Sequence, residues 1–329
     1  MATPLAVVGL GPRGREWARE VHAHPAFDLV ACVDVDPAAR AAAQRELGLG
    51  AGAVHATIDD AHATTPLSAA LIATPPQHHA LPCRAALELE LGVLIEKPFT
   101  QDLAEAIELV DRAEAAAVPL LVAQSYRRLR VHRAARDVVR SGRLGEIRQV
   151  VCQHYRIEPE PAIRGEHSTL WDLGAHHLDA IRDLVDDEPV AVLANSFDEG
   201  LSAQVLLEFE RGARVTYHAT RRSSGHRFFE GGKEHYLRVL GDRGTLHVLH
   251  RWLLLFESGR APRLVRRGRR DRTEEAQLLD ELESALRGAA PGGISGHANI
   301  GTMAILDACA RSATERQWVA LGVGATTDP

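Results

Sequence analysis

Short apolar runs alternate with segments of helical spacing through the first 124 residues, and this alternation constrains the fold more than any other feature of the chain. The runs have the length and composition of buried strands, and a proline at position 37 opens one of the helical segments at its first turn. The predicted strands cover residues 4–9, 29–34, 68–74, 92–97 and 119–124. Strictly alternating strands and helices predict a parallel sheet covered on both faces, which is a doubly wound nucleotide-binding fold.

After about residue 125 the pattern changes to consecutive strands joined by short polar or glycine-bearing turns. The predicted elements are helices over 130–141, 171–180, 274–287 and 297–313, and strands over 146–156, 189–197, 202–209, 213–220, 236–241, 244–249 and 252–256. Strands in direct succession indicate a large, mostly antiparallel open sheet. We therefore predict an α/β protein with two domains, a Rossmann domain over 1–124 and an α+β domain over 125–329.

The first strand is followed by the pattern Gly-x-Gly-x-x-Gly, formed by Gly9, Gly11 and Gly14 around Pro12 and Arg13. Between a strand and a helix, these glycines permit a tight turn, the approach of a pyrophosphate and close packing of the helix. Asp34 ends the next strand, where a carboxylate accepts hydrogen bonds from a free ribose hydroxyl and repels a 2′-phosphate. The pattern favours NAD over NADP, and the nearby Arg40 leaves NADP possible.

Lysine is rare in this chain: of 38 basic side chains only Lys97 and Lys233 are lysines. Lys97 follows Glu96 at the end of strand 92–97, and ligands of doubly wound sheets bind at the carboxyl ends of the strands. An ammonium group is compact and its pKa shifts with its surroundings, whereas a guanidinium group stays charged. We expect Lys97 to border the cofactor.

The segment WDLGAHHLDA (171–180) permits three interpretations. On a helix, Asp172, His176 and Asp179 share one face and the adjacent His177 points about 100° away. Ser168 or Thr169 could cap the start of the helix. A metal site would need a third ligand, such as Glu166 or His167. In a purely structural role, the histidine and aspartate would cap the helix and pair within a domain interface. We favour the third interpretation, acid–base catalysis by His176 with Asp172 as its partner, because imidazole titrates near neutral pH. We expect no metal ion.

Composition excludes several other classes of protein. A net charge of −6 gives no electrostatic reason to bind nucleic acid or an anionic membrane. No apolar run approaches the length of a membrane span. The four cysteines are scattered and form no CxxC pair, which fits a reducing cytoplasm.

Five segments together resemble the glucose-fructose oxidoreductase/inositol dehydrogenase/MocA-like (Gfo/Idh/MocA) family. They read GLGPRG, IATPPQHH, GVLIEKPFT, SYRRLRVHRAARDVVRSGRLGEI and WDLGAHHLD, and the tail SGHANIGTMAILDACARSATERQWV is similar to the closing helix of that family. The resemblance implies NAD(P)-dependent oxidation of sugars or polyols and a C-terminal sheet that mediates formation of a homodimer or homotetramer. It also implies a cis Lys97–Pro98 bond.

The expected site combines the resemblance with the residues that we expect to line the substrate pocket. The resemblance implies Lys97, Asp172 and His176 as catalytic residues. Expected cofactor contacts are Gly9, Gly11, Pro12, Arg13, Gly14, Asp34, Thr74, Pro75, His79, Glu96 and Lys97. Expected substrate contacts are Tyr126, Arg127, His154, Asp172 and His176, with Arg156, Glu158 and Arg164 nearby. Two other functions share this fold: a non-catalytic NAD(P)-sensing protein, and a hydrolase or epimerase that uses bound NAD transiently.

Overall fold

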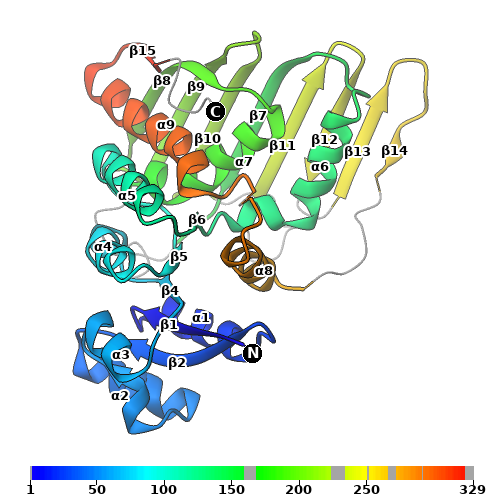
Figure 1. Ribbon diagram of the computed structural model, residues 1–329. Helices are drawn as coiled ribbons and strands as arrows, with labels where there is room; N and C mark the ends of the chain where they lie inside the picture. Colours follow the sequence, from blue (N-terminus) through cyan, green and yellow to red (C-terminus); the bar gives the residue numbers. More distant parts are fainter. Residues whose placement is uncertain are drawn as a thin grey trace. The chain divides into compact units, whose positions relative to one another are not determined.

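The computed structural model describes residues 2–158, 168–223, 234–249, 252–265, 272–290 and 292–322, and the chain divides into two compact units. The first unit contains Met1–Ser125 and Arg272–Ile300, and the second contains Tyr126–Asp271 and Gly301–Pro329. Figure 1 shows the helices and strands of both, coloured along the sequence.

The first unit is built on a six-stranded parallel sheet in the order β3-β2-β1-β4-β5-β6. Its strands are β1 (Thr3–Val8), β2 (Phe27–Val33), β3 (Val54–His55), β4 (Ala69–Ile72), β5 (Gly92–Ile95) and β6 (Leu120–Val122). Its first five helices are α1 (Pro12–Ala23), α2 (Pro37–Leu47), α3 (Ile58–Thr64), α4 (Ala80–Glu88) and α5 (Leu103–Ala115). This strand order is that of dinucleotide-binding domains, and it confirms the predicted doubly wound fold.

Helix α8 (Glu274–Leu286) belongs to the first unit, although the predicted boundary assigned every residue after 124 to the second domain. The leucines Leu278, Leu279 and Leu282 of α8 are fully buried within the hydrophobic core of the parallel sheet. The backbone N–H of Val122 in β6 also donates to the carbonyl of Ile294 at 2.8 Å. The core of the first unit therefore needs a segment that follows most of the second unit in sequence.

The second unit is built on a nine-stranded sheet in the order β14-β13-β12-β11-β7-β10-β9-β8-β15. Its strands are β7 (Ile147–Tyr155), β8 (Pro189–Phe197), β9 (Ser202–Phe209), β10 (Arg214–Thr220), β11 (Glu234–Gly241), β12 (Gly244–Leu249), β13 (Trp252–Glu257), β14 (Arg263–Leu264) and β15 (Val319–Ala320). Neighbouring strands pair antiparallel except for the parallel pair β7–β10. The predicted, mostly antiparallel sheet is confirmed.

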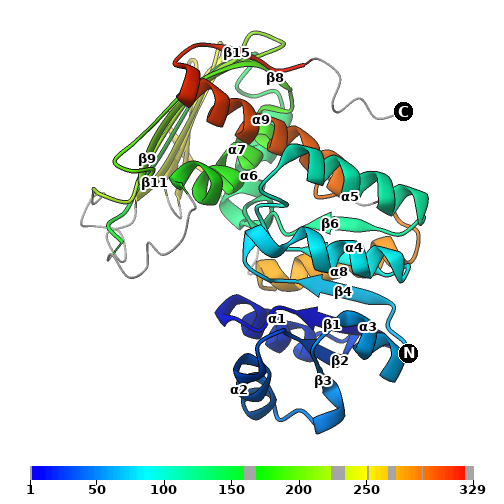
Figure 2. The ribbon, with the colours of Figure 1, turned by 90° about the vertical axis from the view of Figure 1, so that its left-hand side faces the viewer.

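Three helices pack on one face of this sheet: α6 (Arg130–Arg140), α7 (Ala175–Val185) and α9 (Gly296–Glu315), which begins in the first unit (Figure 2). Among the described elements the opposite face carries no helix. Alternate strand residues therefore have different environments, as in β7, where Val150, Cys152 and His154 are buried toward the helices. None of the helices in the described part of the chain combines the length and apolar character needed to cross a bilayer.

Candidate active site

Three glycines form the turn between β1 and α1, and each meets different surroundings. Gly9 has a φ of +90°, and a Cβ added there would lie 2.6 Å from the backbone nitrogen of Thr74. A Cβ added at Gly14 would lie 1.7 Å from the carbonyl oxygen of Gly9. A Cβ added at Gly11 would meet nothing within 4 Å. The first and third glycines therefore allow internal packing, while the second borders open space that a pyrophosphate can approach.

Helix α1 begins at this turn with its N–H groups available. Gly11 occupies the N-cap position without a capping side chain, and Pro12 stands in the first turn. The first backbone N–H groups of a helix have no intrahelical acceptor, and the helix dipole favours a negative charge there. The start of α1 therefore suits a phosphate group.

Asp34 follows β2 and lies beside the glycine turn. Its carboxylate accepts hydrogen bonds from the backbone N–H of Leu10 at 2.7 Å and of Asp36 at 2.8 Å. The guanidinium of Arg40 donates to the carbonyl of Asp34 at 2.6 Å. Two backbone donors fix the carboxylate where a ribose hydroxyl is expected, so the residues of this turn fit a dinucleotide with an unphosphorylated adenosine ribose.

His79 connects the loops that follow β4 and β5. It is 1% exposed, and its ring nitrogens lie 2.9 Å from the carbonyl of Thr74 and 2.9 Å from that of Pro98. The Lys97–Pro98 bond is cis, which confirms the expectation. Both ring nitrogens thus face backbone carbonyls and link the two loops, and the cofactor contact of His79 stays a prediction. Thr74 and Pro75 begin the first of the two loops, and Pro75 is exposed.

Glu96 accepts three hydrogen bonds at the end of β5, from the guanidinium of Arg13 at 2.5 Å, the indole of Trp17 at 2.7 Å and the backbone of Lys97 at 3.0 Å. Burial alone would raise the pKa of Glu96, but the charge of Arg13 and these hydrogen bonds hold the pKa below its ordinary value. Arg13 also pairs with Glu275 of α8 at 3.0 Å. Arg13 and Glu96 therefore form an ion pair, and Lys97 is the next residue after Glu96.

In the second unit, Asp172 lies in a π-helical turn (Leu170–Gly174) and His176 in the first turn of α7. Of the two predicted caps, Ser168 makes the contact, because its hydroxyl accepts from the N–H of Trp171 at 3.4 Å. The imidazole of His176 stacks on the ring of Tyr126, with centroids 4.7 Å apart and an interplanar angle of 26°. Tyr126 thus fixes the plane of the proposed base.

Asp172 belongs to a charged network that the sequence did not reveal. Its carboxylate accepts a hydrogen bond from the guanidinium of Arg221, and the guanidinium of Arg156 lies 3.8 Å away. Glu158 pairs with Arg156 at 2.5 Å and with Arg221 at 3.3 Å. Arg221 is only 5% exposed. Two acids and two guanidinium groups therefore surround the predicted catalytic helix with nearly balanced charge.

Arg127, which the sequence predicts as a substrate contact, has its hydrogen-bond partners inside the second unit. Its guanidinium is buried and donates to both oxygens of the fully buried Asp179, at 2.6 and 2.8 Å, and to Asp183 at 3.2 Å. The hydroxyl of Thr302 also donates to Asp179 at 2.8 Å. This arrangement uses Arg127 to join helices, and its predicted substrate contact stays a prediction. Asp179 is occupied by Arg127 and Thr302, and the π-turn breaks the predicted α-helical spacing between Asp172 and the residues of α7.

His154 is buried, and it contacts two histidines that sequence reasoning missed, His177 and His235. His177 was set aside because it points away from His176, and the pairing of distant strands that brings His235 close leaves no signal in the sequence. Arg164, Glu166 and His167, named as pocket residues or metal ligands, lie outside the described residues.

Comparison with known proteins identifies the family. Residues 4–124 match the model of an oxidoreductase family with an NAD-binding Rossmann fold, and residues 132–247 match the GFO/IDH/MocA C-terminal domain. The chain belongs to the Gfo/Idh/MocA oxidoreductase family. Its first unit therefore contains the NAD-binding domain of a Gfo/Idh/MocA oxidoreductase, in agreement with the glycine turn and Asp34.

Individual relatives of this Gfo/Idh/MocA protein have several names. It is 33% identical over 190 residues to a putative UDP-kanosamine synthase oxidoreductase subunit of Amycolatopsis mediterranei, a match to 55% of this chain and about half (51%) of that protein. It is 25% identical to an inositol 2-dehydrogenase of Rhizobium meliloti over 98% of this chain and 100% of that protein. An inositol dehydrogenase homologue of Azotobacter vinelandii, solved with NADH and myo-inositol, superposes with a TM-score of 0.85 at 22% identity, covering 97% and 98% of the two chains.

Proposed function

We propose that this oxidoreductase transfers a hydride between NAD and a hydroxyl-bearing carbon of a sugar, cyclitol or related polyol, with His176 as the general acid and base. The observation that carries this proposal is the placement of His176 at the start of α7, stacked on Tyr126 and preceded by the ion-paired Asp172. Relatives named inositol 2-dehydrogenase and 1,5-anhydro-D-fructose reductase support the substrate class.

Oxidation of an alcohol removes a hydride from carbon and a proton from oxygen, and the two need separate acceptors. Bound NAD supplies the hydride acceptor. His176 would take the proton, because a neutral imidazole is the side-chain base whose ordinary pKa lies closest to neutral pH. The product is a carbonyl group, and in the reverse direction the imidazolium returns the proton.

Two further residues would act on the reacting hydroxyl and its neighbour. Lys97 would donate a hydrogen bond to the reacting oxygen and stabilise negative charge that develops there. Asp172 would orient a neighbouring hydroxyl or the imidazole itself, and the guanidinium of Arg221 donates a hydrogen bond to it. Lys97 belongs to the first unit and the other two residues to the second.

The residues near Asp172 suit a ligand with many hydroxyl groups. Arg156, Glu158 and Arg221 provide donors and acceptors of both charge signs, and Tyr126 adds an aromatic surface. Sugars and cyclitols present hydroxyl groups that can satisfy such donors and acceptors at once.

The direct experiment supplies a panel of cyclitols, aldoses and uronic acids with NAD or NADP and follows the nicotinamide absorbance. We expect turnover with NAD on at least one cyclitol or sugar. In His176→Ala we expect kcat to fall about 10²–10⁴-fold, the usual contribution of a general base, while the Kd for NAD stays within twofold. His22→Ala, at an exposed position in the last turn of α1, is the control and should keep full turnover.

Two results would contradict this function. Binding of NAD without turnover on the whole panel would favour an NAD-sensing protein. Conversion of substrate with no net NADH, by a protein that retains cofactor through purification, would favour a hydrolase or epimerase that uses NAD transiently.

We also propose that the helix-free face of the nine-stranded sheet joins two or more copies of the chain. It carries exposed apolar side chains, including Leu206 (40% exposed), Trp252 (56%) and Phe256 (38%). Light scattering should give a multiple of 35.8 kDa for the wild type and a lower mass for Leu206→Glu/Trp252→Glu. A monomeric wild type would contradict this assembly. The four cysteines are all free and buried, which suits the cytoplasm that we propose as its location.

A further inference from the structure

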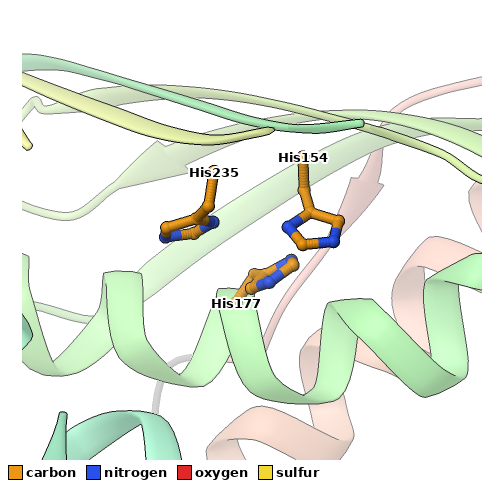
Figure 3. A group of neighbouring side chains, drawn as sticks. All are labelled: His154, His177 and His235. Carbon is orange, nitrogen blue, oxygen red and sulfur yellow. The ribbon is translucent and has the colours of Figure 1, made fainter. Parts of the chain in front are cut away.

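Three imidazoles converge beneath the nine-stranded sheet, those of His154, His177 and His235 (Figure 3). Each can offer a ring nitrogen, and these three atoms lie within 4.8 Å of one another. The ring centroids are 4.8 Å apart for His154 and His177, 5.0 Å for His177 and His235, and 5.7 Å for His154 and His235. The three rings are therefore spaced similarly around a common centre.

The fold brings these residues together from three distant parts of the sequence. Strands β7 and β11 pair antiparallel in a register that places His154 directly opposite His235. Both residues continue buried rows of their strands, Val150 and Cys152 in β7 and Val239 and Leu237 in β11. His177 projects from α7 toward the sheet and completes the group.

His177 has the properties of a prepared ligand. It is 1% exposed, and its Nδ1 lies 3.0 Å from the hydroxyl of Tyr217, which is itself fully buried. Its Nε2 is buried and has no hydrogen-bond partner among the residues that the structure describes. Tyr217 can therefore hold Nδ1 away from the site and leave Nε2 to face it.

We propose that His154, His177 and His235 bind one divalent metal ion of the zinc class through three imidazole nitrogens, leaving one coordination position open. Zinc binds imidazole at about 2.0–2.1 Å in tetrahedral geometry, which places ligand nitrogens roughly 3.4 Å apart. The ligand nitrogens of the cluster lie within 4.8 Å of one another, so zinc binding would draw them closer by tilting the rings toward their common centre. Three neutral nitrogen ligands without a carboxylate favour zinc, copper, nickel or iron over magnesium and calcium.

The proposed metal site differs from the one considered for WDLGAHHLDA, because it uses His177 and neither Asp172 nor His176. It adjoins the proposed base through Tyr126, whose ring stacks on His176 and lies edge-on to His177 at 5.1 Å and to His235 at 5.9 Å. All three ligands belong to the second unit. Metal binding can therefore be tested without NAD and without a known substrate.

The experiment uses the untagged full chain, stripped with a chelator and titrated calorimetrically with zinc chloride alone. We expect one zinc ion per chain and a submicromolar Kd. His154→Gln, His177→Gln and His235→Gln should each weaken binding at least about 100-fold, since each removes one of three ligands. His247→Gln is the matched control, because it also lies in the sheet beside a tyrosine but outside the cluster, and its Kd should stay within twofold.

Two further measurements keep the test independent of any variant that fails to fold. X-ray absorption at the zinc edge of the wild type should show three imidazole nitrogens at about 2.0–2.1 Å. Tyr217→Phe preserves the shape of the core and should weaken zinc binding about 10–100-fold through loss of the partner of Nδ1. Wild-type protein that binds no stoichiometric zinc, an absorption spectrum without imidazole ligands, or equal affinity in all three ligand variants and the control would overturn the proposal.

Discussion

At the scale of single residues, Gly11 and Gly14 differ in why glycine stands at each position of the turn. Gly14 is needed by the protein itself, because its neighbour is the carbonyl of Gly9. Gly11 borders open space and has an extended backbone that any residue adopts. One glycine thus serves the fold and the other the ligand.

This difference predicts opposite results for two alanine substitutions. Gly14→Ala should lower the free energy of unfolding by about 3 kcal/mol, because the new methyl group would overlap backbone that cannot move freely. Gly11→Ala should leave the unfolding free energy within about 0.5 kcal/mol of wild type and raise the Kd for NAD at least about tenfold. Urea unfolding and calorimetry measure the two effects. A Gly11→Ala protein that binds NAD normally would show that the pyrophosphate does not approach this position.

The lowered pKa of Glu96 predicts that the free energy of unfolding decreases at acid pH. Its pKa is lower in the folded chain than the ordinary value of 4.5, so the folded state binds fewer protons than the unfolded state as the pH falls. Its stabilising contribution is complete above about pH 4.5 and is lost as the pH falls through the lowered pKa. Glu96→Gln should cost about 1–3 kcal/mol at pH 7 and show a shallower loss of stability below pH 4.5.

Unfolding of both proteins in urea at several pH values checks this prediction. Asp102→Asn, a change at an exposed helix cap of the same unit, is the control for general charge removal. Parallel acid profiles for wild type and Glu96→Gln would contradict the assignment.

At the scale of elements, the buried pair Arg127–Asp179 joins the segment before α6 to α7, and Thr302 adds α9. Asp179→Leu should destabilise the protein by about 3–5 kcal/mol, because it leaves a buried guanidinium without its main partner. The double variant Arg127→Met/Asp179→Leu removes both charges and should recover much of that loss. Thermal unfolding and the KM for substrate distinguish the roles: a rise in KM without loss of stability in Arg127→Met would restore the predicted substrate contact.

Most elements could be predicted from hydrophobic spacing alone. The strands 189–197, 202–209 and 244–249 have the predicted bounds. The two-residue strands β3, β14 and β15 were missed, since two residues carry no periodic signal. The π-turn before α7 was taken for α-helix, because π- and α-helical turns have similar compositions.

The residues of the candidate site also differ in whether the sequence could predict their positions. Gly9, Gly14 and Asp34 could be placed from the sequence because their contacts are set by a local strand–turn–helix arrangement. The histidine cluster could not, because it depends on the register between β7 and β11, which lie far apart in the chain. The buried ion pair of Arg127 could not be predicted either, because a buried ion pair and a ligand contact use the same residue type.

At the scale of the whole molecule, the position of α8 predicts that a substitution late in the sequence destabilises the first unit. Leu282 is fully buried in the core of the first unit, so Leu282→Ala should cost about 2–5 kcal/mol there. NAD at 100 times its Kd should return about 2.7 kcal/mol, because it binds that unit when folded. Leu253→Ala, equally buried in the second unit, is the matched control. Unfolding curves with and without NAD measure the loss of stability and its recovery. If NAD stabilised Leu253→Ala but not Leu282→Ala, the assignment of α8 to the first unit would be contradicted.

The first unit is formed by two segments that lie far apart in the sequence, and this affects how it folds during synthesis. A ribosome adds about 5–20 residues each second and releases the chain from its N-terminal end. The parallel sheet emerges early, but α8 and Ile294, which complete its core, are translated only after the strands β7 to β14. A nascent chain therefore holds an unfinished nucleotide-binding unit while the second sheet is being made. A truncation near residue 125 removes α8 and Ile294 and leaves the first unit permanently incomplete.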